Sequence, residues 1–278
     1  MIEQKTLLRA VSSALDEDLG AGDITTDAVI PAEALAHARI VARHAMVVSG
    51  IEVARTVFHC VDASLIFTTE RSDGDILDGP ATLARVDGRA RGILTGERTA
   101  LNFLQRMSGI ATATRRVVDC SGPKAVISDT RKTAPGLRAF DKEAVRAGGG
   151  SSHRAGLFDA ILIKDNHWRL CGGIAAAVHR VRQGRGAGES IEIEVGSLDE
   201  LHEAIEAGAN AVLLDNFDEV TLRRAVAAGR GRVFLEISGG VTEESIARLA
   251  DLGVDRISMG ALTHSVSAAD IALEIEPA

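Results

Sequence analysis

Aromatic residues are nearly absent from this chain. Tyrosine does not occur, and phenylalanine and tryptophan together make up 3% of the 278 residues. Proteins that hold nucleic acid stack bases on aromatic side chains and present basic surfaces to the phosphates. Because the chain has few such side chains and a formal net charge of −8, we do not expect it to bind nucleic acid.

Cysteine and long apolar runs are also scarce. Cys60, Cys120 and Cys171 are odd in number, lie far apart and form no CxxC pair. This pattern favours reduced thiols over a disulfide framework or a zinc site. No run of about 18 apolar residues is present, and residues 1–6 do not begin a secretion signal. These absences predict a cytoplasmic protein that does not enter a membrane.

Positive charge, by contrast, is concentrated in one part of this acidic chain, between Asp129 and Trp168. The same stretch is broken by Thr133-Ala-Pro-Gly136 and by Gly148-Gly-Gly150, where the backbone can approach a ligand closely. A solvated helix surface would need neither break. We therefore predict that this stretch forms the floor of a site for a small, multiply charged anion. Its cationic candidates are Arg131, Lys132, His153, Arg154, Lys164 and His167.

The second half of the chain repeats a strand–helix unit. Amphipathic helix patterns at 198–207 and 242–250 alternate with near-continuous apolar runs of strand length. Such strands are typical of a parallel sheet covered by helices, and the repeat lacks an obvious dinucleotide-binding turn, which favours a β/α barrel. Six strands are visible, so an incomplete barrel is predicted. They span 125–128, 160–163, 190–195, 211–214, 233–237 and 256–259.

Polar or glycine residues follow the C-terminal ends of these strands. Examples are residues 129–132, Lys164 and Asp215. In β/α barrels the chemistry takes place at this end of the strands. Glu192 and Glu194 alternate with apolar neighbours and so point to the same face, with Glu194 nearer the end of its strand. Charged residues from strands distant in sequence therefore predict one shared site.

The first hundred residues show a different pattern. We expect a smaller α/β domain over residues 1–108, a barrel domain over 109–264, and a tail, 265–278, that packs onto the first domain. The predicted elements of the first part are a helix at 6–19, a polar loop at 20–26, strands at 36–48 and 64–70, a helix at 51–61 and a long helix at 96–119.

Three motifs in the cationic stretch make the sequence recognisable. They are Asp129-Thr-Arg-Lys-Thr-Ala-Pro-Gly-Leu137, Gly148-Gly-Gly-Ser-Ser-His-Arg-Ala-Gly-Leu157 and Leu162-Ile-Lys-Asp-Asn-His167. Together they closely resemble the quinolinate phosphoribosyltransferase family. One departure is Ser151-Ser152, where many members carry Asn beside the histidine. The resemblance continues over nearly the whole chain in segments 17–26, 96–102, 108–112, 192–195, 214–216, 236–240 and 258–264.

The resemblance implies a fold, a reaction and an assembly. Members join an N-terminal open-faced α/β sandwich domain to an α/β barrel of fewer than eight strands, in agreement with the six predicted strands. They transfer phosphoribose from phosphoribosyl pyrophosphate to quinolinate, with decarboxylation to nicotinate mononucleotide, in the de novo synthesis of NAD. They form homodimers or higher homo-oligomers, and Arg98 is the residue expected to reach the site from the neighbouring subunit.

The cationic residue types suit this chemistry. Quinolinate carries two adjacent carboxylates, and guanidinium groups grip carboxylates in a fork geometry. We expect Arg131, Arg154 and His153 to hold these carboxylates. Lys132 and Lys164 are expected to add positive charge that is shared with the donor phosphates.

Acidic and glycine-rich positions are expected to bind the second substrate, the phosphoribosyl pyrophosphate donor. Mg²⁺ needs only one or two protein carboxylates beside substrate phosphates, so Glu194 and Asp215 are its expected ligands. Loops after the last two strands are expected to cradle the 5′-phosphate. The predicted catalytic residues are Lys132, Lys164, Glu194 and Asp215. The predicted substrate-binding residues are these four with Arg98, Thr130, Arg131, His153, Arg154, Ser238, Gly239, Gly240, Met259, Gly260, Ala261 and His264.

Two other functions stay open at this level. A related molybdenum-transport-associated protein shares the Thr-Arg-Lys-Thr-x-Pro-Gly element and the barrel, but it tends to lose the lysine that stands here at Lys164. A non-catalytic protein that binds phosphosugars is the second alternative, and the presence of both Glu194 and Asp215 weighs against it. Slow use of nicotinate as acceptor is also compatible with the sequence.

Overall fold

The computed structural model describes residues 2–184 and 186–278, which form two compact units. The first unit comprises Met1–Arg115, Thr133–Gly149 and Leu262–Ala278, and the second comprises Arg116–Lys132 and Gly150–Ala261. Among the described residues, no helix combines the length and the apolar character needed to cross a membrane.

The first unit draws its elements from both ends of the chain. Two further helices, α4 (Ala90–Ser121) and α11 (Ala261–His264), run across the boundaries between the units. The elements of the first unit are α1 (Gln4–Leu19), α2 (Ile24–Val29), β1 (Leu35–Ala42), β2 (Met46–Val47), α3 (Ile51–Val61), β3 (Ile66–Thr69), β4 (Ile76–Leu77), β5 (Ala81–Arg89), α5 (Arg138–Ala147) and β12 (Ile271–Pro277).

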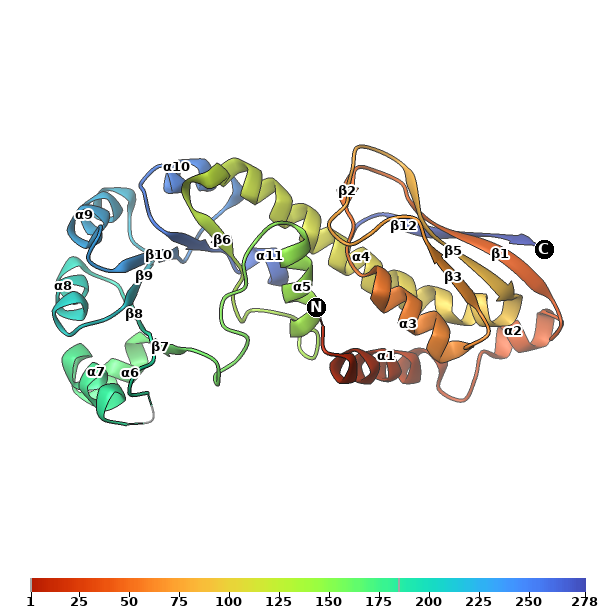
Figure 1. Ribbon diagram of the computed structural model, residues 1–278, viewed down its shortest axis with the longest axis horizontal. Helices are drawn as coiled ribbons and strands as arrows, with labels where there is room; N and C mark the ends of the chain where they lie inside the picture. The colour runs from red at the N-terminus through yellow and green to blue at the C-terminus, as the bar shows by residue number, and fades with distance from the viewer. Residues whose placement is uncertain (1, 185) are drawn as a thin grey trace. The chain divides into compact units, whose positions relative to one another are not determined.

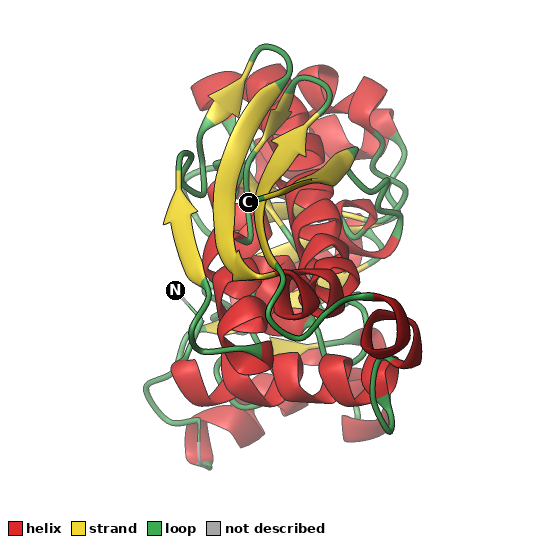
Figure 2. Ribbon diagram, turned by 90° about the vertical axis from the view of Figure 1, so that its right-hand side faces the viewer, coloured by secondary structure: helices red, strands yellow, loops and turns green. Residues whose placement is uncertain are grey.

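An antiparallel sheet in the order β12-β1-β5-β3 forms the centre of the first unit. Along β1, every second residue from Ala36 to Ala42 is buried, because successive side chains of a strand point to opposite faces. The helices cover the buried face, where the rings of Phe58 in α3 and Phe67 in β3 lie 6.0 Å apart (Figure 2). The other face carries the cross-strand pair Arg39–Glu274, at 2.9 Å. This is the open-faced α/β sandwich that the family resemblance implies.

Two chain segments join the first unit from far along the sequence. The tail forms β12, which pairs with β1 over the register from Ala36 to Ala42. Residues 133–149, which the predicted boundaries assign to the barrel domain, also lie in the first unit. The reason is the packing of α5 against α4, where the rings of Phe140 and Phe103 lie 5.3 Å apart.

The second unit is a parallel sheet flanked by helices. Figure 1 shows α6 to α9 on the outer side of β7 to β10 (Figure 1). Its elements are η1 (Gly122–Lys124), β6 (Val126–Ser128), β7 (Ile161–Ile163), α6 (Asp165–Cys171), α7 (Ile174–Gln183), β8 (Ile191–Val195), α8 (Leu198–Glu206), β9 (Ala211–Asp215), α9 (Glu219–Gly229), β10 (Phe234–Ser238), η2 (Glu243–Ser245), α10 (Ile246–Ala250) and β11 (Arg256–Ser258).

The order of these strands defines an incomplete barrel, as predicted. It is β6-β11-β10-β9-β8-β7, so the first of the six strands pairs with the last. Within the described residues, β6 and β7 are not paired, although they are consecutive in sequence. The chain between them includes residues 133–149 of the other unit, and only an isolated bridge between Ser128 and Ser151 extends the edge of β6.

Local differences from the predicted elements have local causes. The predicted strand at 36–48 is divided into β1 and β2. The helix α2 begins within the predicted polar loop, where the Asp23 carboxylate accepts a hydrogen bond from the Thr26 N–H at 2.9 Å and caps the helix. The predicted helix at 242–250 opens as the 3₁₀ turn η2, with a reciprocal cap between Thr242 and Ser245, before α10 begins.

Candidate active site

A cavity of about 460 Å³ lies at the C-terminal ends of the parallel strands. Each of the six strands contributes to it, either through its last residues or through the residues directly after it. Such convergence is the general arrangement of sites in β/α barrels. The lining residues are Thr130, Arg131, Lys132, His153, Arg154, Leu162, Lys164, Glu194, Leu213, Asp215, Asn216, Glu236, Ser238, Gly239, Gly240 and Ser258.

Most of the site residues predicted from the sequence lie on this cavity, but five do not. Met259, Gly260 and Ala261 do not line it, although Ser258 does. The N–H of Met259 donates to the carbonyl of Ser128 at 2.9 Å, so the sheet already uses a group that was expected to cradle phosphate. Arg98 and His264 belong to the first unit.

Arg98, His264 and His167 do not line the cavity, and each has different neighbours. Arg98 is exposed on α4. The Nδ1 of His264 lies 2.8 Å from the hydroxyl of Ser265. His167 does not line the cavity, and its Nδ1 accepts the backbone N–H of Lys164 at 2.9 Å. His167 therefore stabilises the start of α6 rather than adding charge to the site.

The carboxylates and amines of the cavity form one electrostatic group. The ammonium of Lys164 forms an ion pair with the carboxylate of Glu194. Burial raises the pKa of Asp215, and the negative charge of Glu194 raises it further, while Lys164 and Lys132 act in the opposite direction. Two carboxylates held near each other at a solvent-accessible strand end favour a cation between them.

Two guanidinium groups stand close together in the same cavity. Burial lowers the pKa of Arg154, and the neighbouring positive charge of Arg131 lowers it further. Arginine remains charged at neutral pH in spite of such a shift. A pair of cations that repel each other in this way gains stability from an anion placed between them, and a dicarboxylate would provide two such groups.

His153 differs from the other cationic candidates because its partners are buried. Its backbone N–H donates to the Oδ1 of Asp129 at 2.8 Å. Its Nε2 lies 3.3 Å from a carboxylate oxygen of Glu192 and 3.5 Å from one of Glu236. Burial of the ring lowers the pKa of His153, but the two carboxylates outweigh this effect and raise it to about 9. The two carboxylates therefore favour the cationic form of the imidazole.

A close approach between two loops shapes the rim of the cavity. Asn216 has a φ of 56°, which non-glycine residues rarely adopt, and its side-chain amide donates to the carboxylate of Asp215 at 2.8 Å. Gly239 has a φ of 84°, and a Cβ added there would come within 2.3 Å of the Asn216 Oδ1. The glycine is therefore required by space as well as by its backbone conformation.

Sequence reasoning assigned no site role to several residues that line the cavity. Asn216 stands in a motif noted from the sequence, and the tolerance of asparagine for left-handed conformations is the only local indication of its place. Glu236 and Ser258 carry no such indication, because an acid or a serine within an apolar strand is compatible with many environments. Leu162 and Leu213 supply apolar lining.

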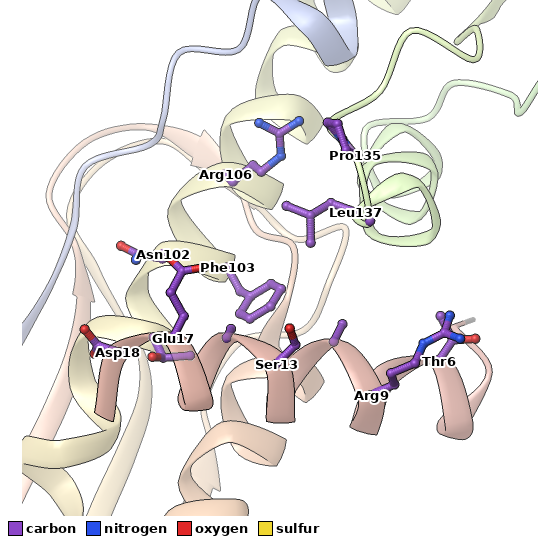
Figure 3. A pocket seen from close by; sticks show the side chains of 14 residues that line it. Thr6, Arg9, Ser13, Glu17, Asp18, Asn102, Phe103, Arg106, Pro135 and Leu137 are labelled. Carbon is purple, nitrogen blue, oxygen red and sulfur yellow. The ribbon is translucent and has the colours of Figure 1, made fainter. Parts of the chain in front are cut away.

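A second cavity, of about 670 Å³, lies within the first unit between α1, α4 and the loop at 135–137. Figure 3 shows Thr6 and Arg9 toward one end of α1 and Glu17 and Asp18 toward the other (Figure 3). Arg106, on the opposite wall, is already bound to the carboxylate of Asp141. The acids of this cavity stand apart from the end of α1 that carries Arg9, whereas acids and cations converge at the strand ends, so we assign the chemistry to the smaller cavity.

Comparison with known proteins agrees with this geometry. Residues 23–108 match the N-terminal domain of quinolinate phosphoribosyl transferase, and residues 110–274 match its C-terminal domain. A relative from Bacillus subtilis, named probable nicotinate-nucleotide pyrophosphorylase [carboxylating], is 41% identical over 93% of this chain and 90% of its own. A chloroplastic protein of the same name from Arabidopsis thaliana is 41% identical over 97% of this chain and 83% of its own.

Solved structures show the same similarity. The nicotinate-nucleotide pyrophosphorylase from Francisella tularensis superposes with a TM-score of 0.95 at 40% identity, covering 99% of this chain and 98% of its own. A nicotinate-nucleotide pyrophosphorylase from Pyrococcus furiosus shares the fold, with a TM-score of 0.72 at 18% identity over 100% of this chain and 77% of its own. On the strength of the two domain matches and these relatives, the chain belongs to the quinolinate phosphoribosyltransferase family.

Proposed function

We propose that this protein is a decarboxylating pentosyltransferase that converts quinolinate and phosphoribosyl pyrophosphate into nicotinate mononucleotide, pyrophosphate and CO₂ in NAD biosynthesis. The observation that carries the proposal is the cavity at the strand ends, where Arg131 and Arg154 stand with Lys164, Glu194 and Asp215. Relatives about 40% identical over most of this chain are named for the same reaction. The cytoplasm is the proposed location, although the plant relatives are named for chloroplasts or mitochondria.

The residues of the cavity act by positioning and charge stabilisation. Arg131, Arg154 and His153 hold the two carboxylates of quinolinate, so that its ring nitrogen faces the anomeric carbon of the donor. The new C–N bond forms as the C–O bond to pyrophosphate breaks, through a loose and cation-like ribosyl transition state. The alkylated ring nitrogen is cationic, and it stabilises the ring carbanion left by departing CO₂ until a proton replaces it.

The acid pair fits a magnesium site. Glu194 and Asp215 provide hard oxygen ligands, and the pKa of Asp215, raised by burial and by Glu194, reflects a demand for positive charge at this point. Lys164 meets part of that demand through its ion pair with Glu194. When bound, Mg²⁺ would neutralise charge on the departing pyrophosphate. Ser238, Gly239 and Gly240 are the residues that we assign to the donor phosphate.

The choice of acceptor provides the direct test of this function. Purified protein is supplied with phosphoribosyl pyrophosphate and Mg²⁺, together with either quinolinate or nicotinate, and the nucleotide and CO₂ are identified. We expect nicotinate mononucleotide and one CO₂ per turnover from quinolinate, with much slower turnover of nicotinate. Binding without product would favour a non-catalytic phosphosugar-binding protein. Product from an acceptor other than quinolinate would favour the molybdenum-transport-associated relative.

We also propose that the protein is a homodimer or a higher homo-oligomer whose sites are shared between subunits. Large apolar side chains are exposed on the second unit: Phe158 is 88% exposed and Leu170 is 91% exposed. Phe158 stands only four residues after Arg154, which lines the cavity. An apolar surface beside a charged site suits a covering subunit, and Arg98 is the residue that a second copy would deliver.

Shared sites predict complementation between two inactive variants. Arg98→Ala and Lys164→Ala are each expected to be nearly inactive alone. A mixed dimer rebuilds one of its two sites, with Lys164 from one chain and Arg98 from the other, so the purified mixed dimer should regain about half of wild-type activity. Activity is measured on dimers purified through two different tags. If the mixed dimer is as inactive as its parents, Arg98 does not act across the subunit boundary.

A further inference from the structure

Four charged side chains meet beneath the cavity, and the proposed function does not yet account for three of them. His153, Glu192, Glu236 and Arg256 form what we call the buried ion cluster. The Arg256 Nη2 donates to the Oε1 of Glu192 at 2.9 Å, and its Nε donates to the Oε2 of Glu236. The carboxylate oxygens on the same side chains face the Nε2 of His153.

The cluster extends through the interior of the barrel to the cavity. Glu236 is paired in register with Arg256 on the neighbouring strand, which places carboxylate and guanidinium side by side. The guanidinium of Arg256 also lies 5.1 Å from the centre of the Phe234 ring. At the other end of the cluster, His153 and Glu236 line the cavity itself. The chain of contacts therefore runs without interruption from Phe234 to the site.

Stability alone does not explain such a cluster. The side chain of Glu236 is fully buried, and those of Glu192 and His153 are each 10% exposed. Buried ion pairs are often no more stabilising than apolar residues of the same volume, because the charges lose their hydration. The ligand atoms of His153, Glu192 and Glu236 lie within 4.8 Å of one another, as in a metal site. Arg256, however, already supplies the cation that these carboxylates require.

The arrangement decides which donors His153 offers. With the imidazole protonated, the cluster contains two positive and two negative charges and is neutral beneath a site for anions. The Arg154 N–H lies 2.7 Å from the Nδ1 of His153. A neutral ring accepts this bond at Nδ1, whereas an imidazolium cannot, but the negative charges of the two carboxylates at Nε2 favour the protonated ring. Protonation of the ring therefore breaks this bond, and the Nδ1–H of His153 and the N–H of Arg154 then become two donors that an anion can use.

We propose that Glu236, Glu192 and Arg256 are positioning residues of the transfer reaction, which hold His153 as a cationic donor beside the Arg154 N–H. The charged groups around the ring are Glu192 from β8, Glu236 from β10, Arg256 from β11, Asp129 after β6 and Arg154 itself. The identity of the bound anion rests on the proposed function. The coupling between His153 and the cluster does not, because it exists in the free protein.

Histidine titration by nitrogen-15 NMR tests the coupling without any substrate. The chain has eight histidines, and the His153 signal is identified by its loss in His153→Asn. In the wild type we expect a midpoint of about 9. Glu236→Gln keeps the shape of the side chain but removes a negative charge, so the midpoint should fall by about one pH unit or more. Arg256→Met removes a positive charge from the cluster and should raise the midpoint.

These opposite directions separate charge coupling from structural damage, which would move both variants toward the ordinary histidine value. Glu219→Gln is the matched control, because Glu219 is also paired with arginine, at 2.8 Å from Arg223, but lies on the outer helix α9. It should leave the midpoint unchanged. A wild-type midpoint near the ordinary value, or shifts of the two cluster variants in the same direction, would falsify the proposal.

Steady-state kinetics test the consequence for the reaction. In Glu236→Gln at pH 8, we expect the KM of one substrate to rise about twofold if the His153 midpoint falls by one pH unit and about tenfold if it falls by two. The change in kcat should be smaller, because the charge-assisted hydrogen bond is lost together with the proton. A rise for quinolinate assigns the anion to its carboxylate, and a rise for phosphoribosyl pyrophosphate assigns it to a phosphate. If neither KM changes although the His153 midpoint has fallen, the cluster has no role in positioning. If the wild type makes no nucleotide at all, the proposed function fails, and the titration result still stands by itself.

Discussion

Replacement of Lys164 by methionine is expected to lower kcat by about a hundredfold or more, because one preorganised charge in an enclosed site contributes on that scale. The side chain follows β7, forms an ion pair with Glu194 and lowers the pKa of Asp215. In the proposed reaction, its ammonium would stand where negative charge accumulates as pyrophosphate leaves. Methionine keeps most of the apolar stem, so the substitution removes the charge with little change in packing.

The measurement is kcat, together with KM for both substrates, at saturating Mg²⁺. Lys124→Met is the matched control, because Lys124 is also paired with a carboxylate, that of Asp251 at 2.6 Å, but lies exposed in η1 before β6. The control should retain full activity. A kcat of Lys164→Met within about threefold of the wild type would remove Lys164 from the catalytic residues.

Replacement of Asp141 by alanine is expected to lower the free energy of unfolding by about 3–5 kcal/mol. This is the usual cost of removing one partner of a buried ion pair, because the charge of the other partner is left uncompensated. Asp141 in α5 is fully buried, and its two carboxylate oxygens accept from the Nε and Nη2 of Arg106, each at 2.8 Å. It also accepts the backbone N–H of Ala134 at 3.1 Å. Its loss leaves the partly buried Arg106 without that carboxylate and opens a cavity between α4 and α5.

Urea unfolding measures this effect, with the slope checked for constancy. Glu70→Ala is the control in the same unit, since Glu70 pairs with Arg85 at 2.6 Å on a more exposed surface. Exposed ion pairs contribute about 0–1 kcal/mol, so the control should unfold near the wild-type midpoint. Equal destabilisation by the two substitutions would show that burial does not distinguish the pairs.

Local patterns in the sequence were sufficient for much of the second unit. Continuous apolar runs placed all six parallel strands to within about two residues, which is the usual precision of strand boundaries. Helices with clear amphipathic spacing, such as the one at 51–61, coincide with α3. The polar residues after most of these strands meet at one cavity, because parallel strands bring their carboxyl ends to the same edge. Boundaries that depend on capping hydrogen bonds, as at α2 and η2, were predicted less accurately from the sequence.

The two glutamates of β8 show where local information ends. Their spacing places Glu192 and Glu194 on the same face. In the sequence, the two glutamates differ only in their distance from the C-terminal end of the strand. In the structure Glu194 reaches the cavity and meets Lys164, whereas Glu192 is buried against Arg256. Arg256 lies 64 residues further along the chain, so no window of sequence contains both partners.

The sequence by itself therefore determined the kinds of element, the end of the sheet at which the cavity lies and the family to which the chain belongs. These depend on side-chain periodicity and on motifs that occupy short segments. Only the tertiary structure decided that β6 pairs with β11, that α5 lies in the first unit and that four distant charges meet beneath the cavity. Such features depend on the order of strands in the sheet. That order sets which residues, although remote in sequence, lie together in the interior and form ion pairs there.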